Sequence, residues 1–382
     1  MSVKPAASPL SAPLDLCERV PSYVRAISPY QPGKPITELA REFGLDEKSI
    51  VKLASNENPM GPSPRARAAI EVALPELARY PDQFELIRAL AAKLGVAPDG
   101  IVLGNGSNDV LEMVAAAFLA PGRSSVFSEH AFAVYALATQ ARGAAGLVVP
   151  ARDFGHDLEA MLAAIRADTT VVFAANPNNP TGTLLPAGAL ARFLEAVPKS
   201  VLVVLDEAYN EYLSPEAKPA TVEWLALHPN LVITRTFSKA YGLAGLRVGY
   251  ALCHPAVAAL LNRVRQPFNV NNLALVAAIA ALDDEAFVAK SHDLNRRGMK
   301  QLCDAFARLG LTWIPSYGNF VAVQIPRKGG DLQAAVVYQA LLRQGVIVRP
   351  IAGYNMPDHL RVTVGLPEEN ARLVAALERA LA

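Results

Sequence analysis

Four short polar segments interrupt the apolar runs of this 382-residue chain, and each carries side chains that can bind a ligand or move a proton. They are Gly104-Asn105-Gly106-Ser107-Asn108-Asp109, Asn178-Asn179-Pro180-Thr181-Gly182, Asp206-Glu207-Ala208-Tyr209 and Thr236-Phe237-Ser238-Lys239. Each also has an ordinary structural interpretation. Asn, Pro and Gly mark turns, an aspartate after a strand can cap a helix, and a lysine at a strand end is usually solvated.

The four segments gain meaning when they are considered together. A Gly-rich turn that opens a helix, as around Gly106, presents free backbone N–H groups and a positive dipole end to a phosphate, although it does not match the dinucleotide fingerprint. Lys239 has two hydroxyls beside it, and Arg247 follows eight residues later. Together the segments supply a phosphate cradle, a carboxylate, a phenol, an amide and an amine. Pyridoxal phosphate requires this set of groups from a protein.

The elements that must position these groups alternate between helices and short apolar strands from about residue 62 to residue 265. Near-continuous runs of Val, Ile, Leu and Phe are typical of strands buried on both faces of a parallel sheet. In such a sheet ligands lie beyond the carboxyl ends of the strands, where the four segments fall. The strand candidates are Ile101 to Leu103, Ser125 to Phe127, Gly146 to Val149, Thr170 to Ala174, Val201 to Leu205, Leu231 to Arg235 and Arg247 to Leu252.

The pattern predicts an α/β protein with a large, doubly wound, mostly parallel sheet domain and a smaller α+β domain. We expect an N-terminal arm (1–35), a segment joining the small domain (36–61), a large cofactor-binding domain (62–270) and a small C-terminal domain (271–382). A chain of this length is too long for one simple core. The other predicted elements are a helix from Pro35 to Phe43, a strand from Ile50 to Ala54, a helix from Asp284 to Leu309, and then Gly318 to Ile325, Leu332 to Gln344, Val346 to Arg349, His359 to Val364 and Glu368 to Leu381.

Composition limits the possible functions. Apolar residues make up 52% and charged residues 19%, and the net charge of +1 gives no general attraction to nucleic acid or to an anionic membrane. The three cysteines (Cys17, Cys253 and Cys303) form neither a disulfide framework nor a metal site, and they suit a reducing compartment. No signal-peptide core and no apolar run of bilayer length is present in the sequence. We expect a cytoplasmic enzyme acting on small molecules, without a nucleic-acid or membrane partner and without a metal.

Six motifs in order give the chain a resemblance to a known family. These are Asn-Glu-Asn-Pro, Arg-Tyr-Pro-Asp, Asn-Asn-Pro-Thr-Gly, Asp-Glu-Ala-Tyr, Ser-Lys with Gly-Leu-Arg-Val-Gly, and Leu-Arg-Val-Thr-Val-Gly. The chain resembles the fold-type I aminotransferases, and among them the histidinol-phosphate aminotransferase family, from Tyr30 to Arg361. The resemblance implies a homodimer with shared active sites that exchanges an amino group between L-histidinol phosphate and 2-oxoglutarate (glutamate), in histidine biosynthesis.

The resemblance also implies roles for the residues around pyridoxal phosphate. Lys239 would hold the cofactor as a Schiff base and later shuttle the substrate proton, which requires a pKa below the usual value of roughly 10. Asp206 would pair with the pyridinium nitrogen, and Asn179 and Tyr209 would bond the phenolic oxygen. The residues implied for the phosphate are Gly106, Ser107, Asn108, Thr236, Ser238 and Arg247, with Tyr80 reaching it from the partner subunit.

One departure from the family pattern concerns the aromatic residue that stacks on the pyridine ring. Many relatives have a tyrosine or tryptophan there, whereas Phe132 stands at the matching place and Tyr135 lies nearby. Stacking needs only an aromatic face. We interpret His130 as a structural or pocket-wall residue and not as a base.

Substrate binding is expected from four residues. Arg361 matches the arginine that binds the α-carboxylate in aminotransferases; here it would serve 2-oxoglutarate and the substrate phosphate. Arg349 and Tyr30 are further candidates for that phosphate, although Arg349 can equally be an ordinary surface arginine. Asn58 is expected to line the same pocket.

Several alternatives stay open at the sequence level. An aromatic amino acid aminotransferase or a phosphothreonine decarboxylase would keep every cofactor residue, because reaction specificity depends on fine geometry. An aminotransferase-fold regulator would need a DNA-binding unit for which the first 35 residues are too short. A nicotinamide dehydrogenase would need a Gly-rich fingerprint after the first strand, which the sequence lacks.

Overall fold

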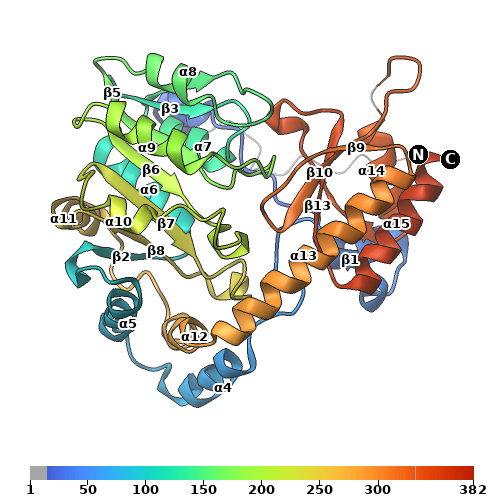
Figure 1. Cartoon of the computed structure of the whole chain (residues 1–382), viewed down its shortest axis with the longest axis horizontal. Helices are drawn as coiled ribbons and strands as arrows, with labels where there is room; N and C mark the ends of the chain where they lie inside the picture. The colour runs from blue at the N-terminus through green and yellow to red at the C-terminus, as the bar shows by residue number, and fades with distance from the viewer. Residues whose placement is uncertain (1–14, 332) are drawn as a thin grey trace.

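The computed structural model describes residues 15–331 and 333–382. It has a large body built on a seven-stranded sheet and a smaller body built on a four-stranded sheet, with the long helix α13 (Glu285–Arg308) running between them (Figure 1). Residues 1–14 of the expected arm and Leu332, the first residue of an expected helix, lie outside the described residues. The α/β fold with a large, mostly parallel sheet is confirmed.

The seven strands of the large sheet lie in the order β2-β8-β7-β6-β5-β3-β4. Neighbouring strands from β7 through β4 pair in parallel, and β8 alone runs against both of its neighbours. The carboxyl ends of β5, β6 and β7 therefore meet at one edge, where the polar segments follow them. The bounds are β2 (Ile101–Gly104), β3 (Ser124–Ser128), β4 (Ala145–Val149), β5 (Thr169–Ala175), β6 (Leu202–Asp206), β7 (Leu231–Thr236) and β8 (Gly249–Cys253).

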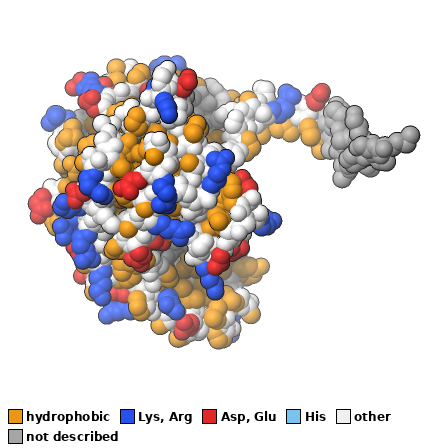
Figure 2. All heavy atoms as spheres, turned by 90° about the vertical axis from the view of Figure 1, so that its right-hand side faces the viewer, with side chains coloured by type: hydrophobic (Ala, Val, Ile, Leu, Met, Phe, Trp, Pro, Cys, Tyr) orange, Lys and Arg blue, Asp and Glu red, His pale blue; other side chains and the backbone are white. Residues whose placement is uncertain are grey.

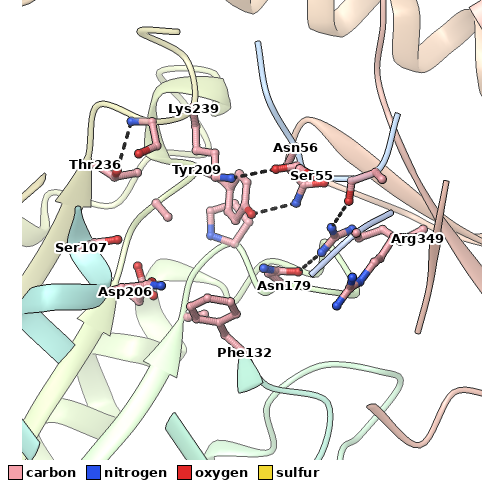
Figure 3. Close-up of a pocket in the computed structure, with 18 of the residues that line it drawn as sticks. Ser55, Asn56, Ser107, Phe132, Asn179, Asp206, Tyr209, Thr236, Lys239 and Arg349 are labelled. Carbon is pink, nitrogen blue, oxygen red and sulfur yellow. Dashed lines mark hydrogen bonds between the residues drawn. The ribbon is translucent and has the colours of Figure 1, made fainter. Parts of the chain in front are cut away.

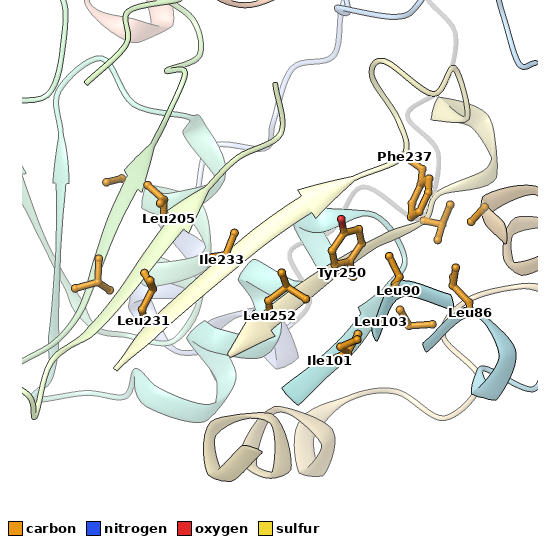
Figure 4. Close-up of a cluster of buried hydrophobic side chains, with 14 of the residues drawn as sticks. Leu86, Leu90, Ile101, Leu103, Leu205, Leu231, Ile233, Phe237, Tyr250 and Leu252 are labelled. Carbon is orange, nitrogen blue, oxygen red and sulfur yellow. The ribbon is translucent and has the colours of Figure 1, made fainter. Parts of the chain in front are cut away.

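Alternate residues of each central strand point to opposite faces of the sheet, and each face has its own apolar cluster. Val172 and Ile233 belong to one cluster, while Phe173 and Val232 belong to the other. Helices α5 (Phe84–Leu94), α9 (Ala187–Ala196) and α12 (Asn272–Leu282) contribute to the first cluster, part of which is shown in Figure 4. Helices α6 (Ser107–Phe118), α7 (Ala133–Ala141) and α11 (Pro255–Val264) contribute to the second. Full burial of one such side chain contributes about 1.5–3 kcal/mol, so the strand ends are held on a rigid base.

Two strands of the large sheet differ from the sequence prediction. The edge strand β4 is covered on one side only, and Val148 keeps 57% of its surface exposed. Strand β8 begins at Gly249, because Arg247 adopts a left-handed conformation with φ of 58° before the strand starts. A residue in that conformation cannot belong to an extended strand.

The small body combines a two-stranded and a four-stranded sheet. The first pairs β1 (Val51–Lys52) in parallel with β11 (Val346–Ile347), so the early segment joins this body. The second has the order β12-β13-β10-β9 with antiparallel pairing, and its bounds are β12 (Arg349–Pro350), β13 (His359–Thr363), β10 (Phe320–Gln324) and β9 (Thr312–Ile314). Helices α13, α14 (Ala334–Arg343) and α15 (Pro367–Leu381) pack on these sheets, and α3 (Ile36–Phe43) packs beside Leu342 and Ile347. The short strand β9 is not predicted, since three residues are too few to show an alternating pattern.

Helix α12 packs with the large body, although the sequence pattern places it after the domain boundary. The pattern changes at about residue 271, but Ala274, Ala277 and Ala278 of α12 are fully buried in the large-body cluster. Helix α12 also packs closely on α4 (Pro64–Ala73). By packing, the large body therefore extends one helix beyond the expected boundary at residue 270.

The remaining helices are short and lie at the surface or between strands. The α-helices are α1 (Asp15–Glu18), α2 (Ser22–Arg25), α8 (Leu158–Ala163) and α10 (Thr221–Trp224). The 3-10 turns are η2 (Glu47–Ser49), η3 (Leu74–Glu76), η4 (Pro98–Gly100), η5 (Asn210–Tyr212), η6 (Ala244–Leu246) and η7 (Ala352–Tyr354). Within the described part of the chain, no helix has the length and apolar character that crossing a bilayer would need.

Candidate active site

The polar segments come together in one pocket between the large sheet, the small body and the described end of the arm (Figure 3). Thirteen of the residues expected in the site line it: Tyr30, Ser107, Asn108, Phe132, Asn179, Asp206, Tyr209, Thr236, Ser238, Lys239, Arg247, Arg349 and Arg361. Other lining residues were not expected, among them Ser55, Asn56 and Tyr354. The pocket therefore draws on strand ends that are far apart in the sequence.

Lys239 reaches the pocket from the loop after β7. Its Nζ donates a hydrogen bond to the carbonyl oxygen of Ser55 over 3.2 Å and lies 5.8 Å from the centre of the Tyr209 ring. Removal of the amine from water, together with the nearby charge of Arg361, lowers the pKa of Lys239 to about 8. About a tenth of such an amine is neutral and nucleophilic at pH 7, roughly a hundredfold more than at the usual pKa of roughly 10.

Asp206 ends strand β6 and is only 5% exposed. Its two carboxylate oxygens accept hydrogen bonds from the hydroxyls of Tyr135, over 2.9 Å, and Thr234, over 3.1 Å. Burial raises the pKa of Asp206, while the two hydroxyl donors act in the opposite direction. Tyr135 was considered in the sequence only as a stacking candidate; it lies flat on Phe173 beneath the pocket, with ring centres 4.9 Å apart. Of the two stacking candidates, Phe132 is the one that lines the pocket.

Tyr209 is buried and its hydroxyl accepts a hydrogen bond from the Asn56 side chain over 2.9 Å. Burial raises the pKa of Tyr209 to about 12, so the phenol stays protonated at neutral pH. Asn58, which the sequence analysis placed in this pocket, lies outside it. It donates to the carbonyl of Ala240 and to the hydroxyl of Ser291 and borders a separate small cavity. The Asn-Glu-Asn-Pro segment does reach the pocket, but through Asn56 and not through Asn58. The sequence does not distinguish the two, because both asparagines suit a turn equally well.

The start of α6 forms a cradle with Arg247. Gly106 caps this helix with φ of 82° and offers no side-chain acceptor, so the first-turn N–H groups have no side-chain cap. Its backbone approaches Arg247 so closely that a Cβ there would lie 2.5 Å from Nη2. Nη1 of Arg247 donates to the hydroxyl of Ser238 over 3.2 Å, and the amide of Ser238 donates to the hydroxyl of Thr236 over 3.1 Å. Helix-start amides, hydroxyls and a guanidinium are suited to a phosphate.

Arg361 extends from β13 of the small body into the pocket. It donates to the side-chain oxygen of Asn179 and, over 2.8 Å, to the carbonyl of Ala54, and its Cζ lies 5.2 Å from the ring centre of Phe320. Its Nε is buried without a hydrogen-bond partner. Burial, with a contribution from the like charge of Arg349, lowers the pKa of Arg361. An anion bound in the pocket would offset the cost of burying this guanidinium.

Arg349 is held in place by the end of the arm. It donates to the carbonyl of Gln31, and its Cζ lies 5.6 Å from the ring centre of Tyr30. This arrangement excludes the interpretation of Arg349 as an ordinary surface arginine, since it lines the pocket together with Tyr30.

Tyr80 and His130 lie outside the pocket of this chain. Tyr80 is 80% exposed and stacks on Phe268, with ring centres 4.4 Å apart. His130 contacts the backbone carbonyl of Tyr354 through Nδ1 over 2.7 Å, and its own carbonyl accepts a bond from Asn178. The histidine therefore ties the large body to the small one beside the pocket, as expected for a structural residue.

The residues present fit pyridoxal phosphate. The α6 cradle with Arg247 suits a phosphate, Asp206 is a buried carboxylate at the pocket floor, and Lys239 is an amine with a lowered pKa. Asn179 and Tyr209 supply polar groups between them. Phosphate, pyridine nitrogen, aldehyde and phenolic oxygen are the four parts of this cofactor that need a protein partner.

Comparison with known sequences supports this assignment over most of the chain. The sequence model for aminotransferase class I and II matches residues 48–377. The chain is 61% identical over 368 residues to histidinol-phosphate aminotransferase 1 of Dechloromonas aromatica (strain RCB), covering 96% of this chain and 100% of that protein. It is 63% identical over 361 residues to histidinol-phosphate aminotransferase 2 of Pseudomonas aeruginosa, covering 94% and 96% respectively.

Solved structures agree. The histidinol-phosphate aminotransferase of Sinorhizobium meliloti, crystallised with pyridoxal-5'-phosphate, superposes with a TM-score of 0.88 at 30% identity, covering 97% of this chain and 99% of that one. The aspartate aminotransferase of Thermus thermophilus with maleate shares the fold, with a TM-score of 0.78 at 24% identity over 94% of this chain and 98% of that one. The chain is thus a pyridoxal-phosphate-dependent enzyme of fold type I that belongs to the class I and II aminotransferases and, within them, to the histidinol-phosphate aminotransferase family.

Proposed function

We propose that this enzyme transfers an amino group between L-histidinol phosphate and 2-oxoglutarate, giving imidazole acetol phosphate and glutamate in histidine biosynthesis. One observation carries the choice of substrate: Arg361 and Arg349 face the same pocket, and within the described chain neither is paired with a carboxylate. Two uncompensated guanidiniums favour a phosphate dianion or a dicarboxylate. Histidinol phosphate supplies the first and 2-oxoglutarate the second.

We propose the following cofactor contacts from the positions of the side chains. Gly106, Ser107, Asn108, Thr236, Ser238 and Arg247 would hold the phosphate, Asp206 the pyridine nitrogen, Asn179 and Tyr209 the phenolic oxygen, and Phe132 one face of the ring. When bound, pyridoxal phosphate supplies an electron sink for the carbanion formed at the substrate Cα. The buried Asp206 carboxylate, held by Tyr135 and Thr234, supports a proton on the pyridine nitrogen and so favours that sink.

Lys239 provides the covalent anchor and the base. A pKa of about 8 places its proton exchange close to neutral pH, where a general base is most effective. The neutral amine takes the proton from the substrate Cα and returns it to the cofactor side of the bond. Arg361 orients the substrate by binding its anionic group, so that the Cα proton faces Lys239.

We also propose a homodimer with shared active sites. The first described residues of the arm stand out from the body in Figure 2, and every residue from Leu16 to Ser22 is exposed. Leu16 is 70% exposed, and the stacked pair of Tyr80 and Phe268 forms a further exposed apolar surface. Burial of such side chains against a second copy would be favourable. Tyr80 would then reach the phosphate of the partner's cofactor. A cytoplasmic location remains our proposal, on the ground that the three cysteines are unpaired.

The substrate assignment is tested with single half-reactions followed by the visible absorbance of the bound cofactor. The enzyme is mixed separately with histidinol phosphate, phenylalanine and phosphothreonine. Rapid loss of the absorbance with histidinol phosphate alone is the expected result. Faster conversion by phenylalanine would make the enzyme an aromatic aminotransferase, and release of carbon dioxide from phosphothreonine would make it a decarboxylase.

Arg349→Ala separates the substrates further. The variant should raise KM for histidinol phosphate by about tenfold or more, the size expected for a lost charge-assisted contact, and change KM for phenylalanine much less. Equal effects on both substrates would contradict the proposed role of Arg349. Arg343→Ala, at the end of α14 outside the pocket, is the matched control.

A further inference from the structure

A buried chain of hydrogen bonds connects Tyr209 to strand β13 through Asn56. The backbone amide of Asn56 donates to the hydroxyl of Thr363 over 2.9 Å. That hydroxyl donates to Oδ1 of Asn56 over 3.1 Å, and Nδ2 of Asn56 donates to the hydroxyl of Tyr209 over 2.9 Å. Asn56 is 1% exposed, and Tyr209 and Thr363 are 3% exposed, so water does not compete for these bonds.

The direction of each bond follows from the first. A backbone N–H can only donate, so the Thr363 oxygen must accept from Asn56. The buried Thr363 proton then needs an acceptor, and the amide oxygen of Asn56 is the group within reach. With its oxygen on Thr363, Asn56 presents its NH2 group to Tyr209. The opposite orientation of the amide would leave the Thr363 proton without an acceptor.

These bond directions determine what the Tyr209 hydroxyl can do. Because the Tyr209 oxygen accepts from Asn56, its own proton is not used in that bond, and Tyr209 lines the pocket in which it can donate. We propose that Asn56 and Thr363 are positioning residues that turn the Tyr209 hydroxyl so that it donates to an anionic oxygen in the pocket, the phenolic oxygen of the cofactor. This inference rests on the proposed cofactor contacts of Tyr209.

Strand β13 makes this arrangement part of the substrate site. Arg361 and Thr363 are two residues apart on this strand and therefore lie on the same face. Asn56 adopts a left-handed conformation with φ of 55°, which asparagine tolerates better than most residues, and Asn319 holds its carbonyl over 3.0 Å. One strand of the small body thus positions both the guanidinium for the substrate anion and the donor direction of Tyr209.

The test reverses the donor direction without removing Tyr209. In Asn56→Asp the side chain has only acceptor oxygens, so it would take the Tyr209 proton away from the pocket; aspartate also tolerates the left-handed conformation. A donor to the phenolic oxygen stabilises its anionic form, so losing the donor should raise the pH at which the bound cofactor changes its absorbance. We expect an upward shift of about one pH unit in Asn56→Asp, as in Tyr209→Phe. Thr363→Val should shift it in the same direction, and Thr363→Ser should restore the original value.

A double-variant cycle separates this effect from the added negative charge. If Asn56 acts through Tyr209, Asn56→Asp should cause no further shift in a Tyr209→Phe background. An equal shift in both backgrounds would overturn the proposal, as would Thr363→Val and Thr363→Ser behaving alike. Thr312→Val, at the exposed start of strand β9, is the matched control for loss of a threonine hydroxyl. Failure of the proposed Tyr209 contact would look different, because Tyr209→Phe itself would then leave the pH of the absorbance change where it is in the unaltered enzyme.

Discussion

The surroundings of the Lys239 amine lower its pKa. Removal from water is the largest cause, and the charges of Arg361 and Arg247 act in the same direction, so the pKa falls to about 8. Below this pH the amine is protonated and cannot attack an aldehyde; above it the amine is free. We expect the rate at which cofactor-free enzyme attaches pyridoxal phosphate to rise with pH and to level off above about pH 8.

Rapid-mixing absorbance measurements over a pH series test this expectation. Nα-acetyl-lysine in solution, which keeps its ε-amine free, is the control. Its attachment should show a midpoint near the usual lysine pKa of roughly 10. A midpoint for the enzyme as high as that of the control would contradict the lowered pKa, and attachment by Lys239→Ala would exclude Lys239 as the anchor.

Tyr135 acts on the site through Asp206. Tyr135→Phe keeps the ring that packs on Phe173 and removes only the hydroxyl that donates to Asp206. The pKa of Asp206, already raised by burial, should rise further, which weakens its support for a proton on the cofactor. We expect kcat to fall by about tenfold, as for loss of a hydrogen bond to a charged group, with KM nearly unchanged. Steady-state kinetics test this, with Tyr317→Phe at an exposed position as the control; an unchanged kcat would contradict it.

At the scale of elements, the turn before α6 depends on Gly106, because there is no room for a side chain at this position. Gly106 and Gly122 have the same φ of 82°, but a Cβ at Gly106 would lie 2.5 Å from Arg247, whereas nothing lies within 4 Å at Gly122. Both Gly→Ala variants should lose about 1 kcal/mol of stability from backbone strain. Only Gly106→Ala should displace Arg247 and weaken cofactor binding, by about tenfold or more.

Equilibrium titration of the cofactor-free variants with pyridoxal phosphate, together with thermal unfolding, separates the two effects. Gly122→Ala serves as the control because it carries the strain without the steric conflict. Equal cofactor affinities in the two variants would mean that the approach of Gly106 to Arg247 does not matter for binding.

The elements also show how far the sequence leads. The buried strands and the segments after them were predictable, because apolar runs and polar strand ends are local features. The strand expected from Val201 to Leu205, for example, is found one residue later, at Leu202–Asp206. The sequence does not predict the roles of Asn56, Tyr135 and Thr363. These roles depend on hydrogen bonds between residues that are 71 to 307 positions apart. Asn58 was chosen over Asn56 because nothing local distinguishes two asparagines in one turn. Arg247 was placed inside a strand because a left-handed backbone leaves no mark on an apolar pattern.

At the scale of the whole molecule, the pocket exists only where separate bodies meet. The large sheet contributes Asp206 and Lys239, strand β13 contributes Arg361, and the arm holds Arg349 through Gln31. The substrate end of the pocket therefore depends on how the small body is placed, while the cofactor end rests on the large sheet. An anion bound between Arg361 and Arg349 would offset the repulsion of these two like charges.

A second copy of the chain is expected to complete this pocket, and hybrid dimers test that expectation. Tyr80 lies outside its own chain's pocket and is 80% exposed. If it serves the partner's site, a hybrid of one Lys239→Ala chain and one Tyr80→Ala chain has one site with both Lys239 and Tyr80 intact. Mixing the two weakly active variants under conditions that exchange subunits should then restore one active site per hybrid dimer, which is about a quarter of the unaltered activity when half of the dimers are hybrids. If Tyr80 instead serves its own chain, no site in the hybrid is complete, and the mixture should show only the average of the two separate variants.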